Sequence, residues 1–584
     1  MRVTTCVSSL WERPEPPVVA GEASGARVGK LRDVLSPSWL VARLDPVDVV
    51  GTLAEAARSV AADPAAAAAA TARLVTGSLD VLAAATGAAP EADEAPALSD
   101  RRHSHPAWDT NAWYALCRRE HALLAEWARA VAGSAELGPV ATRKLAFVVD
   151  QVVAATDPVN WPLTNPEVPA TARRTGGRSL LQGLRNLARD VATNGGAPLQ
   201  VPRDALVVGR DVAATPGKVV YRNDLVELVQ YAPTTATVHR TPLLLSPPWI
   251  NKYYVMDLAP GRSFAQWAVE HGRTVFALSY RNPGPEHRDL TMADYLDSGL
   301  LAALDVVEDI TGESRADVAA LCLGGTLATA AAAWLAARGD RRIGTLTLLN
   351  TMLDYRDPGP LGVFTDARAV ERLERRMRGP GYLPGSAMRA TFDALRPDDL
   401  VWRYVVEGWW LGRQPPVFDL LVWNADSTRM PAAMQMEYLT GLYVENRLAT
   451  GRMELAGERL DLGAVRHDTY VVAAETDHIA PWRSVHAGAR LLGGDVRFVM
   501  TTSGHIAGVV NPPSPRAGHR VGTGPVPADP DAWRAATPQR QGSWWEDWAV
   551  WARERAGPMR PPPPMGSADH PPLDDAPGRY VRET

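Results

Sequence analysis

The chain has 584 residues, more than one hydrophobic core usually contains, so its length favours two domains. Hydrophobic residues make up 46% of the sequence and charged residues 22%, which is typical of globular proteins that fold in water. The net charge of −5 argues against the basic surface with which nucleic-acid-binding proteins hold phosphates, so we expect no nucleic-acid partner.

The cysteines and the apolar segments indicate in which cellular compartment the protein folds. Cys6, Cys117 and Cys322 are too few for a disulfide framework, and their spacing does not match a zinc site. We therefore expect no metal site and a reducing, cytoplasmic compartment in which a cysteine stays a free thiol. We find no candidate for a transmembrane segment, because the stretch 65–70 is shorter than the roughly 20 residues that a spanning helix needs. Residues 1–17 lack the pattern of a secretory signal.

The N-terminal third of the chain has the spacing of helices. Residues 1–40, rich in proline, glycine and charge, are expected to form a mobile leader, and 41–200 an α-helical domain. Prolines interrupt the helical pattern at 157–162, because proline lacks an N–H and has a fixed φ. Two glycines at 195–196 place the domain boundary near residue 200. The predicted helices lie within 46–87, where there are two or three, and at 113–132, 141–155 and 179–192.

From residue 201 to about 560, short apolar runs alternate with helical stretches, which is typical of a parallel sheet covered on both faces. The alternation stops between about 354 and 465, and we interpret that insertion as a cap over the carboxyl ends of the strands. The proline-rich residues 561–584 are expected to be a tail with little order except where it is held down. Strands are predicted at 219–221, 226–230, 242–245, 274–279, 316–321, 345–349, 469–473 and 496–500, and helices at 293–310 and 326–338.

Cys322 lies where a strand, a sharp turn and a helix follow one another, the context of a nucleophile elbow. Gly324 and Gly325 are the small neighbours that such a turn requires, and Ala320 takes an upstream position where glycine is usual. A helix N-terminus behind the sulfur favours the thiolate, which is a strong nucleophile. We therefore predict an α/β-hydrolase fold with Cys322 as its nucleophile; the alternative is a cysteine that only packs in the core.

The remaining catalytic groups are expected at the carboxyl ends of other strands, in the order acid and then histidine. His505 follows the strand at 496–500 and is the predicted base. Asp477 follows the strand at 469–473 and is the predicted acid, with Glu475 and Asp468 as alternatives.

An oxyanion hole needs two backbone donors near the nucleophile. The N–H of Leu323, which follows Cys322, is the first predicted donor. The second should come from the loop at 246–254, and because its two prolines have no N–H, Trp249 or Ile250 remains.

Around these residues the chain resembles the poly(3-hydroxyalkanoate) synthases of the single-subunit type, class I. The resemblance extends from about residue 100 to the end and is most specific over 157–550. Three departures are Ala320 in place of glycine, Leu321 where an aromatic residue is common, and Trp161 in place of phenylalanine; the arginine-rich stretch 368–385 matches no family pattern. The matching strings are PVNW (158–161), TNPE (164–167), PPWINKYY (247–254), LCLGGT (321–326), LRPDDLVW (395–402), FDLLVWN (418–424), SGHIAGVVNPP (503–513) and GSWW (542–545).

This resemblance implies an acyltransferase that polymerises (R)-3-hydroxyacyl-CoA into a polyester and releases CoA, without a metal or redox cofactor. Cys322 would carry the acyl group or growing chain as a thioester, and His505 would take the thiol proton. Asp477 would orient His505 or help to deprotonate the 3-hydroxyl of the incoming unit, while Leu323 and Ile250 would donate to the oxyanion. The implied partners are the acyl-CoA, the growing polyester, the granule surface in the cytoplasm and a second copy in a homodimer.

Four further side chains are predicted to contact the substrate: Arg396, Asn251, Tyr253 and His478. Arg396 suits either a CoA phosphate or a carboxylate of the cap. The tryptophans between 544 and 551, and those at 402, 409 and 410, are expected to pack in the interior rather than line a channel or meet a granule.

Two other functions compete with polymerisation. One is a cysteine-dependent hydrolase, either a thioesterase or a polyester depolymerase, and the other is a granule-associated protein without turnover. The cap, which would exclude water, and the N-terminal helical domain argue against the hydrolase. A complete triad argues against the non-catalytic protein.

Overall fold

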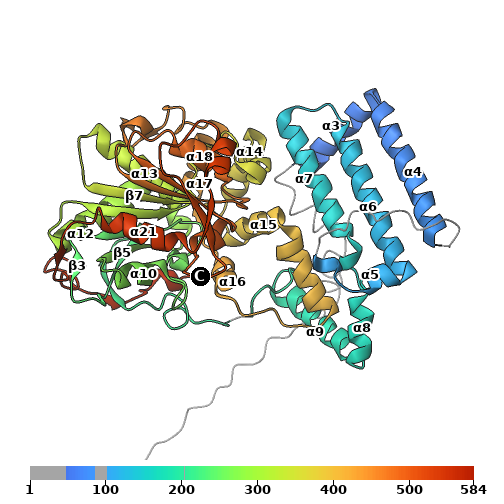
Figure 1. The fold of residues 1–584 in the computed structure, drawn as a ribbon, viewed down its shortest axis with the longest axis horizontal. Coiled ribbons are helices and arrows are strands. Elements are labelled where there is room, and N and C mark those ends of the chain that lie inside the picture. Colours follow the sequence, from blue (N-terminus) through green and yellow to red (C-terminus); the bar gives the residue numbers. More distant parts are fainter. Residues whose placement is uncertain (1–47, 86–100, 203) are drawn as a thin grey trace, which may run out of the picture.

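The computed structural model describes residues 48–85, 101–202 and 204–584. The leader predicted for residues 1–40 lies outside the described residues. Figure 1 shows two bodies, a helical one built from the N-terminal residues and a larger one of strands and helices.

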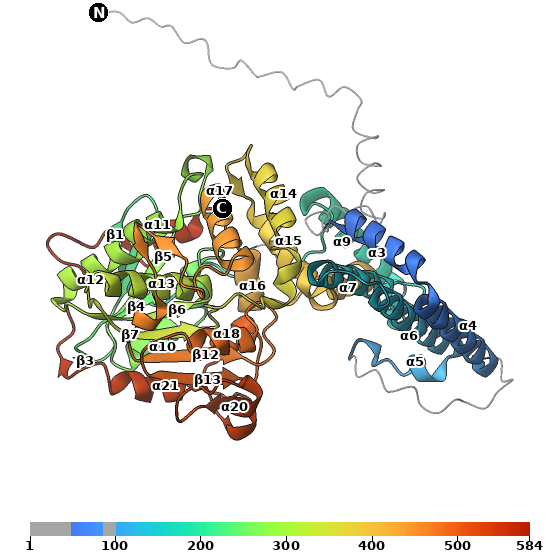
Figure 2. The same cartoon turned by 90° about the horizontal axis from the view of Figure 1, so that it is seen from above.

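The N-terminal body is helical, as predicted. Helices α4, α6 and α7 lie side by side, and α3 packs against α7 (Figures 1 and 2). Its main helices are α3 (Val49–Ala62), α4 (Ala65–Ala85), α6 (Ala112–Gly133), α7 (Pro139–Thr156), α8 (Glu167–Arg174) and α9 (Arg178–Thr193).

Helix α4 corrects the expectation that the chain holds no candidate for a transmembrane segment. It has 21 residues and a mean hydropathy of 1.2, so by length and composition alone it is able to cross a membrane. The expectation rested on residues 65–70, whereas the alanine-rich helix continues to Ala85. One such helix is weak evidence for a membrane span, because helices of other proteins meet the same criteria.

A mixed sheet of eleven strands forms the centre of the larger body of the described chain, in the order β15-β14-β13-β12-β7-β6-β4-β5-β2-β1-β17. The central strands from β5 to β13 are parallel, and antiparallel strands flank them on both sides. Every strand predicted from the sequence is present. The parallel strands are β4 (Leu243–Ser246), β5 (Val275–Tyr280), β6 (Ala316–Leu321), β7 (Ile343–Leu349), β12 (Thr469–Ala474) and β13 (Val496–Thr501); the others are β1 (Gly217–Arg222), β2 (Val226–Tyr231), β14 (Gly518–Val521), β15 (Gln539–Gln541) and β17 (Asp574–Asp575).

Helices cover both faces of this sheet, so the strand side chains are buried on both sides. In β6, Val318 and Ala320 belong to one apolar cluster and Ala319 and Leu321 to the other, as the two-residue period of a strand requires. The helices on the first face are α12 (Ala302–Thr311), α13 (Leu323–Ala337) and α18 (Trp482–Ala489), and those on the second are α10 (Phe264–Glu270) and α21 (Trp544–Arg553). The helix predicted for 293–310 begins with a π-helical segment, Tyr295–Leu301.

The tryptophans of α21 pack in the core. Trp544, Trp545 and Trp548 are at most 1% exposed, and each indole N–H donates a hydrogen bond to a buried oxygen. Trp544 and Trp545 donate to the carbonyl oxygens of Gly508 and Val509, at 2.8 and 2.9 Å. These bonds tie α21 to the segment that follows His505.

The cap lies between β7 and β12, and it touches the helical body. Its helices include α14 (Ala367–Met377), α15 (Gly385–Leu395), α16 (Asp419–Ala425) and α17 (Ala432–Tyr438), and Figure 2 shows α14 and α15 between the two bodies. The side chain of Gln151 donates to the carbonyl of Ala394 at 2.9 Å, and that of Asn186 to the carbonyl of Gly408 at 2.9 Å. Trp402 and Trp409 are buried against Ala154, so they pack between helices rather than line a channel.

Residues 561–584 are held to the sheet, which is the exception that the expectation of a tail with little order allowed. β17 adds to the edge of the sheet beside β1, and Tyr580 and Val581 are at most 5% exposed. An open sheet edge offers unpaired backbone groups, which this segment occupies. The residues between and after the prolines make these contacts, so the proline content alone did not indicate them.

At Gly183, helix α9 of the helical body packs closely against the cap. A Cβ at this position would lie 2.0 Å from the carbonyl oxygen of Trp409. We expect Gly183→Ala to lower the free energy of unfolding by about 1–3 kcal/mol, because the two elements must move apart. Chemical denaturation measures this difference.

Gly133, at the end of α6, is the matched control, because an added Cβ there has no described atom within 4 Å. Gly133→Ala should change the free energy of unfolding by less than about 1 kcal/mol. Equal stabilities of the two variants would contradict the close approach of α9 to the cap.

Candidate active site

Cys322 occupies the single-residue turn between β6 and α13. Its backbone has φ 53° and ψ −121°, a conformation that residues other than glycine rarely adopt. The N–H of Cys322 donates to the carbonyl of Leu349 at 2.9 Å, and its own carbonyl accepts from Gly325 at 2.9 Å. The neighbouring strand and the first turn of the helix therefore hold the strained turn in place.

The small residues after Cys322 are required by crowding. A Cβ on Gly324 would lie 2.4 Å from the carbonyl oxygen of Ser246, and one on Gly325 would lie 1.9 Å from the hydroxyl oxygen of Thr351. Upstream, Ala320 is completely buried in the strand, so its methyl group fits where glycine is usual. This geometry is that of a nucleophile elbow.

His505 and Asp477 form a buried pair. Nδ1 of His505 lies 2.6 Å from Oδ2 of Asp477, and because a carboxylate only accepts, Nδ1 carries the hydrogen. The other carboxylate oxygen accepts the N–H groups of Ile479 at 2.8 Å and Ala480 at 2.9 Å. Asp477 is thus fixed by its own loop, which leaves Nε2 of His505 for Cys322, and both residues line the same cavity.

The charges of the site favour a protonated His505. Burial opposes the imidazolium, but Asp477 and Cys322 outweigh burial and raise the pKa of His505 to about 10. Below that pH His505 is an imidazolium beside the Asp477 carboxylate. Glu475, one of the alternative acids, instead pairs with Arg534, and Asp468 pairs with Arg555.

A cavity of about 750 Å³ adjoins Cys322 and His505. The loop after β4, the elbow, the cap and the segment after α9 all contribute to its wall. Its lining includes Pro248, Ile250, Asn251, Cys322, Leu323, Thr476, His478, His505 and Ile506 from the sheet edge, Leu361, Phe364, Phe392, Arg396, Leu420, Tyr438 and Tyr443 from the cap, and Ala197, Pro198, Leu199, Gln200 and Val201. The wall is mostly apolar, which suits an acyl chain.

Leu323 and Ile250 both line the cavity that Cys322 also lines. Neither backbone N–H donates to another group in the described chain. Trp249, the alternative donor, is 2% exposed and does not line the cavity. Of the two residues that the sequence left open, the structure therefore favours Ile250.

Of the four predicted substrate contacts, three line the cavity and one does not. Asn251 lies at the cavity wall and pairs with Ser427 in an isolated bridge. Arg396 forms an ion pair with Asp399, so the carboxylate partner is the one observed. Tyr253 is 2% exposed and belongs to the apolar cluster behind the loop, which places it away from the cavity and corrects its predicted role.

His478 lines the cavity beside the catalytic pair. Burial and the neighbouring His505 lower the pKa of His478 to about 4, so its imidazole is neutral at physiological pH. Its Nδ1 is buried without a hydrogen-bond partner in the described chain. Two adjacent histidines at one site therefore carry different charges.

Sequence reasoning missed the tyrosines around the sulfur. Tyr438 and Tyr443 reach the cavity from the cap, and the hydroxyl of Tyr355 lies 3.0 Å from that of Thr326 in α13. Burial raises the pKa of all three, so they remain neutral phenols. No local pattern marks these positions, because only the folding of the cap brings them to Cys322.

Comparisons with known proteins give the family. Residues 99–268 match the family model described as Poly-beta-hydroxybutyrate polymerase (PhaC) N-terminus, and residues 243–512 match the alpha/beta hydrolase fold. The poly(3-hydroxyalkanoate) polymerase of Methylorubrum extorquens is 43% identical, over 85% of this chain and 83% of that protein. The chain belongs to the poly(3-hydroxyalkanoate) polymerase family.

Two further members give the same result. The poly(3-hydroxyalkanoate) polymerase subunit PhaC of Rhizobium meliloti (strain 1021) is 41% identical, over 83% of this chain and 80% of that protein. The subunit of the same name from Cupriavidus necator is 39% identical, over 83% of each. The resemblance read from the sequence motifs is thus confirmed, and so is the α/β-hydrolase fold with its helical N-terminal region.

Asp477 provides a test of the ion pair. Because Asp477 raises the pKa of His505, Asp477→Asn should lower it, and less imidazolium then accompanies the sulfur at neutral pH. We expect alkylation of Cys322 by iodoacetamide at pH 7 to slow at least about tenfold. The rate is measured in a chain with Cys6 and Cys117 replaced by serine.

Glu475→Gln is the matched control, since this carboxylate lies in the same loop but pairs with Arg534. It should alkylate at the rate of the parent chain. If Asp477→Asn also kept the parent rate, the proposed charge arrangement would be wrong.

Proposed function

We propose that this chain is an acyltransferase that polymerises (R)-3-hydroxyacyl-CoA into poly(3-hydroxyalkanoate) and releases CoA through a thioester on Cys322. One observation carries the proposal: a cysteine at a strained turn and a buried His505–Asp477 pair line the same largely apolar cavity under a cap. The apolar cavity wall and the membership of the poly(3-hydroxyalkanoate) polymerase family both support an acyl substrate.

In the first step the sulfur of Cys322 attacks the thioester carbonyl carbon of the acyl-CoA. A carbon–sulfur bond to Cys322 forms, the bond to the CoA sulfur breaks, and His505 returns the thiol proton to the leaving thiolate. The N–H groups of Leu323 and Ile250 would stabilise the oxyanion in between. His505 is placed for this proton transfer because Asp477 fixes its ring.

In the second step a 3-hydroxyl oxygen attacks the thioester on Cys322. An ester bond forms, the bond to the Cys322 sulfur breaks, and the hydroxyl proton passes through His505 to that sulfur. Of the two bases that the sequence left open, His505 is favoured over Asp477. The Asp477 side chain has no exposed surface, and its oxygens already accept from Ile479, Ala480 and His505.

The proposed reaction moves an acyl group and protons but no electrons, so its chemistry needs no redox cofactor. Water competes with the hydroxyl acceptor for the thioester, and the cap residues over the cavity support exclusion of water. From the resemblance, the proposed partners are the acyl-CoA, the growing polyester and a second copy of the chain. The proposed place of action is the granule surface in the cytoplasm.

The test supplies the purified chain with (R)-3-hydroxybutyryl-CoA and follows free thiol and turbidity together. Thiol release with turbidity is expected, whereas release without polymer would indicate a hydrolase. Cys322→Ala should lower release by at least about a thousandfold, because the nucleophile is lost. Cys117→Ala is the matched control and should keep the parent rate, since Cys117 lies in α6 outside the cavity. Release that survives in Cys322→Ala would contradict the assignment.

A further inference from the structure

The last residues of the chain return to the loop that carries Ile250. After β17, residues 578–584, here called the latch, fold across the ends of β2 and β5 towards the cap. Its last residue accepts from the side chain of Arg429, which lies in the cap just before α17, so the end of the chain contacts the cap. The latch therefore meets two parts of the active-site wall at one place.

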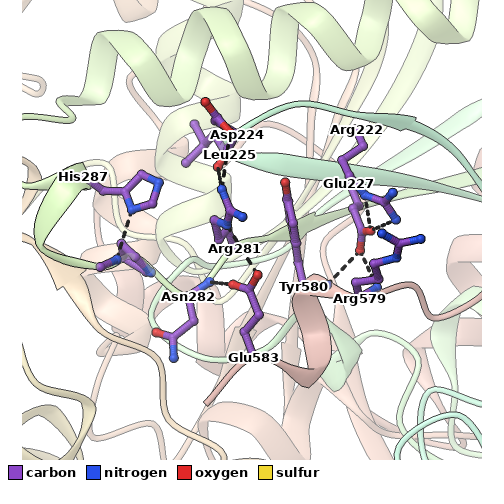
Figure 3. Close-up of polar contacts among 12 residues, drawn as sticks. Arg222, Asp224, Leu225, Glu227, Arg281, Asn282, His287, Arg579, Tyr580 and Glu583 are labelled. Carbon is purple, nitrogen blue, oxygen red and sulfur yellow. Dashed lines mark hydrogen bonds and ion pairs between the residues drawn. The ribbon is translucent and has the colours of Figure 1, made fainter.

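Glu227 of β2 anchors the start of the latch. This carboxylate is completely buried, and it accepts the N–H groups of Arg579 and Tyr580, both at 2.9 Å, and Nε of Arg222 at 2.7 Å (Figure 3). Gly578 has φ +82°, and a Cβ there would lie 2.4 Å from the same carboxylate. With the second Arg222 nitrogen, Glu227 accepts four N–H donors from three residues, and these bonds fix the backbone of the latch.

Tyr580 and Glu583 hold the middle of the latch. The guanidinium of Arg281 lies 4.7 Å from the centre of the Tyr580 ring, and the Tyr580 hydroxyl donates to the carbonyl of Asn223 at 2.5 Å. The Glu583 carboxylate accepts the N–H of Asn282 at 3.2 Å and pairs with Arg281 at 3.4 Å, as Figure 3 shows.

Lys252 connects the latch to the loop after β4. Its side chain is 2% exposed, and its ammonium donates to the carbonyl oxygens of Tyr580, at 3.4 Å, and Glu583. Burial lowers the pKa of Lys252, while Asp426 and Glu583 favour its charged form. A buried ammonium needs such acceptors, so the loop and the latch depend on each other.

The cap holds the same loop from the other side. The carbonyl of Lys252 accepts from the indole of Trp423 at 2.7 Å. Thr428 donates its N–H to the carbonyl of Ile250 at 3.2 Å and its hydroxyl to that of Trp249 at 3.0 Å. Arg429, the next residue, donates to the carbonyl of Thr584 at 3.0 Å, so cap, loop and latch form a closed set of contacts.

We propose that the latch and Lys252 position the oxyanion loop: they keep the N–H of Ile250 at the cavity, opposite that of Leu323. Lys252 is a positioning residue, since it lies behind the loop and does not line the cavity. The inference rests on the proposed function for its catalytic consequence, because an oxyanion donor matters only in acyl transfer. Its structural part, the dependence of the loop on the latch, stands without it.

The test compares Lys252→Met with Lys218→Met. Methionine keeps the length of the buried stem but leaves the carbonyl oxygens of Tyr580 and Glu583 without their donor. Lys218 is the matched control, because it also contacts the tail, through Asp575, but it is half exposed and far along β1 from the loop. A milder variant, Glu583→Gln, loosens the latch without leaving an unpaired group in the core.

We expect Lys252→Met to lower kcat for thiol release about tenfold or more with KM within about twofold, because the oxyanion donor shifts while the cavity remains. Hydrogen exchange at 247–255 should become faster, and alkylation of Cys322 should stay within about twofold of the parent. Glu583→Gln should change the same quantities in the same direction by about two- to threefold, and Lys218→Met should change none.

Parent-like kcat and parent-like exchange at 247–255 in both Lys252→Met and Glu583→Gln would overturn the proposal. If the parent chain itself released no thiol, the proposed function would fail, whereas the exchange measurement would still decide whether the latch holds the loop. A fall in kcat with unchanged exchange would also contradict positioning, because the loop would not have moved.

Discussion

The site depends on one constraint, a cysteine held at a strained turn with its sulfur against a buried imidazole. The φ of +53° at Cys322 is an unfavourable conformation, and it persists because the turn is bonded to β7 and to the first turn of α13. Gly324 and Gly325 let the neighbouring loops approach the turn. Cys322 lines the same cavity as His505, whose ring is fixed by Asp477.

Three distant parts of the chain close around this centre. The cap provides most of the apolar wall, the helical N-terminal body packs on the cap, and the last residues hold the loop that bears Ile250. Such an arrangement gives the reaction space a largely apolar wall, which favours acyl transfer to a hydroxyl over hydrolysis. Much of the chain thus contributes to the wall and the support of a single small reaction site.

Local sequence signals predicted the core of the molecule well. The strands were predicted because their buried runs are short and apolar, and Cys322, Asp477 and His505 because strand ends meet at one edge of a parallel sheet. Residue types alone left Trp249 and Ile250 open as donors, since both have an N–H; the family resemblance implied Ile250, and of the two only Ile250 lines the cavity. Tyr253 was misplaced because chain order alone does not tell which side of a loop faces a cavity.

Long-range contacts were beyond sequence reasoning. Tyr438 and Tyr443 reach the cavity only through the path of the cap, and Lys252 meets residues more than three hundred positions later. The tail looked unstructured by its prolines, yet the buried carboxylate of Glu227 binds it to the sheet. Composition describes a segment by itself, whereas its order depends on partners elsewhere in the chain.

The most direct measurement of the central claim is mass spectrometry of the peptide that contains Cys322 after a reaction with (R)-3-hydroxybutyryl-CoA is quenched in acid. We expect this peptide to gain the mass of one or more hydroxybutyryl units, and neutral hydroxylamine to remove the added mass because the bond is a thioester. An unmodified Cys322 peptide during active turnover would contradict the account.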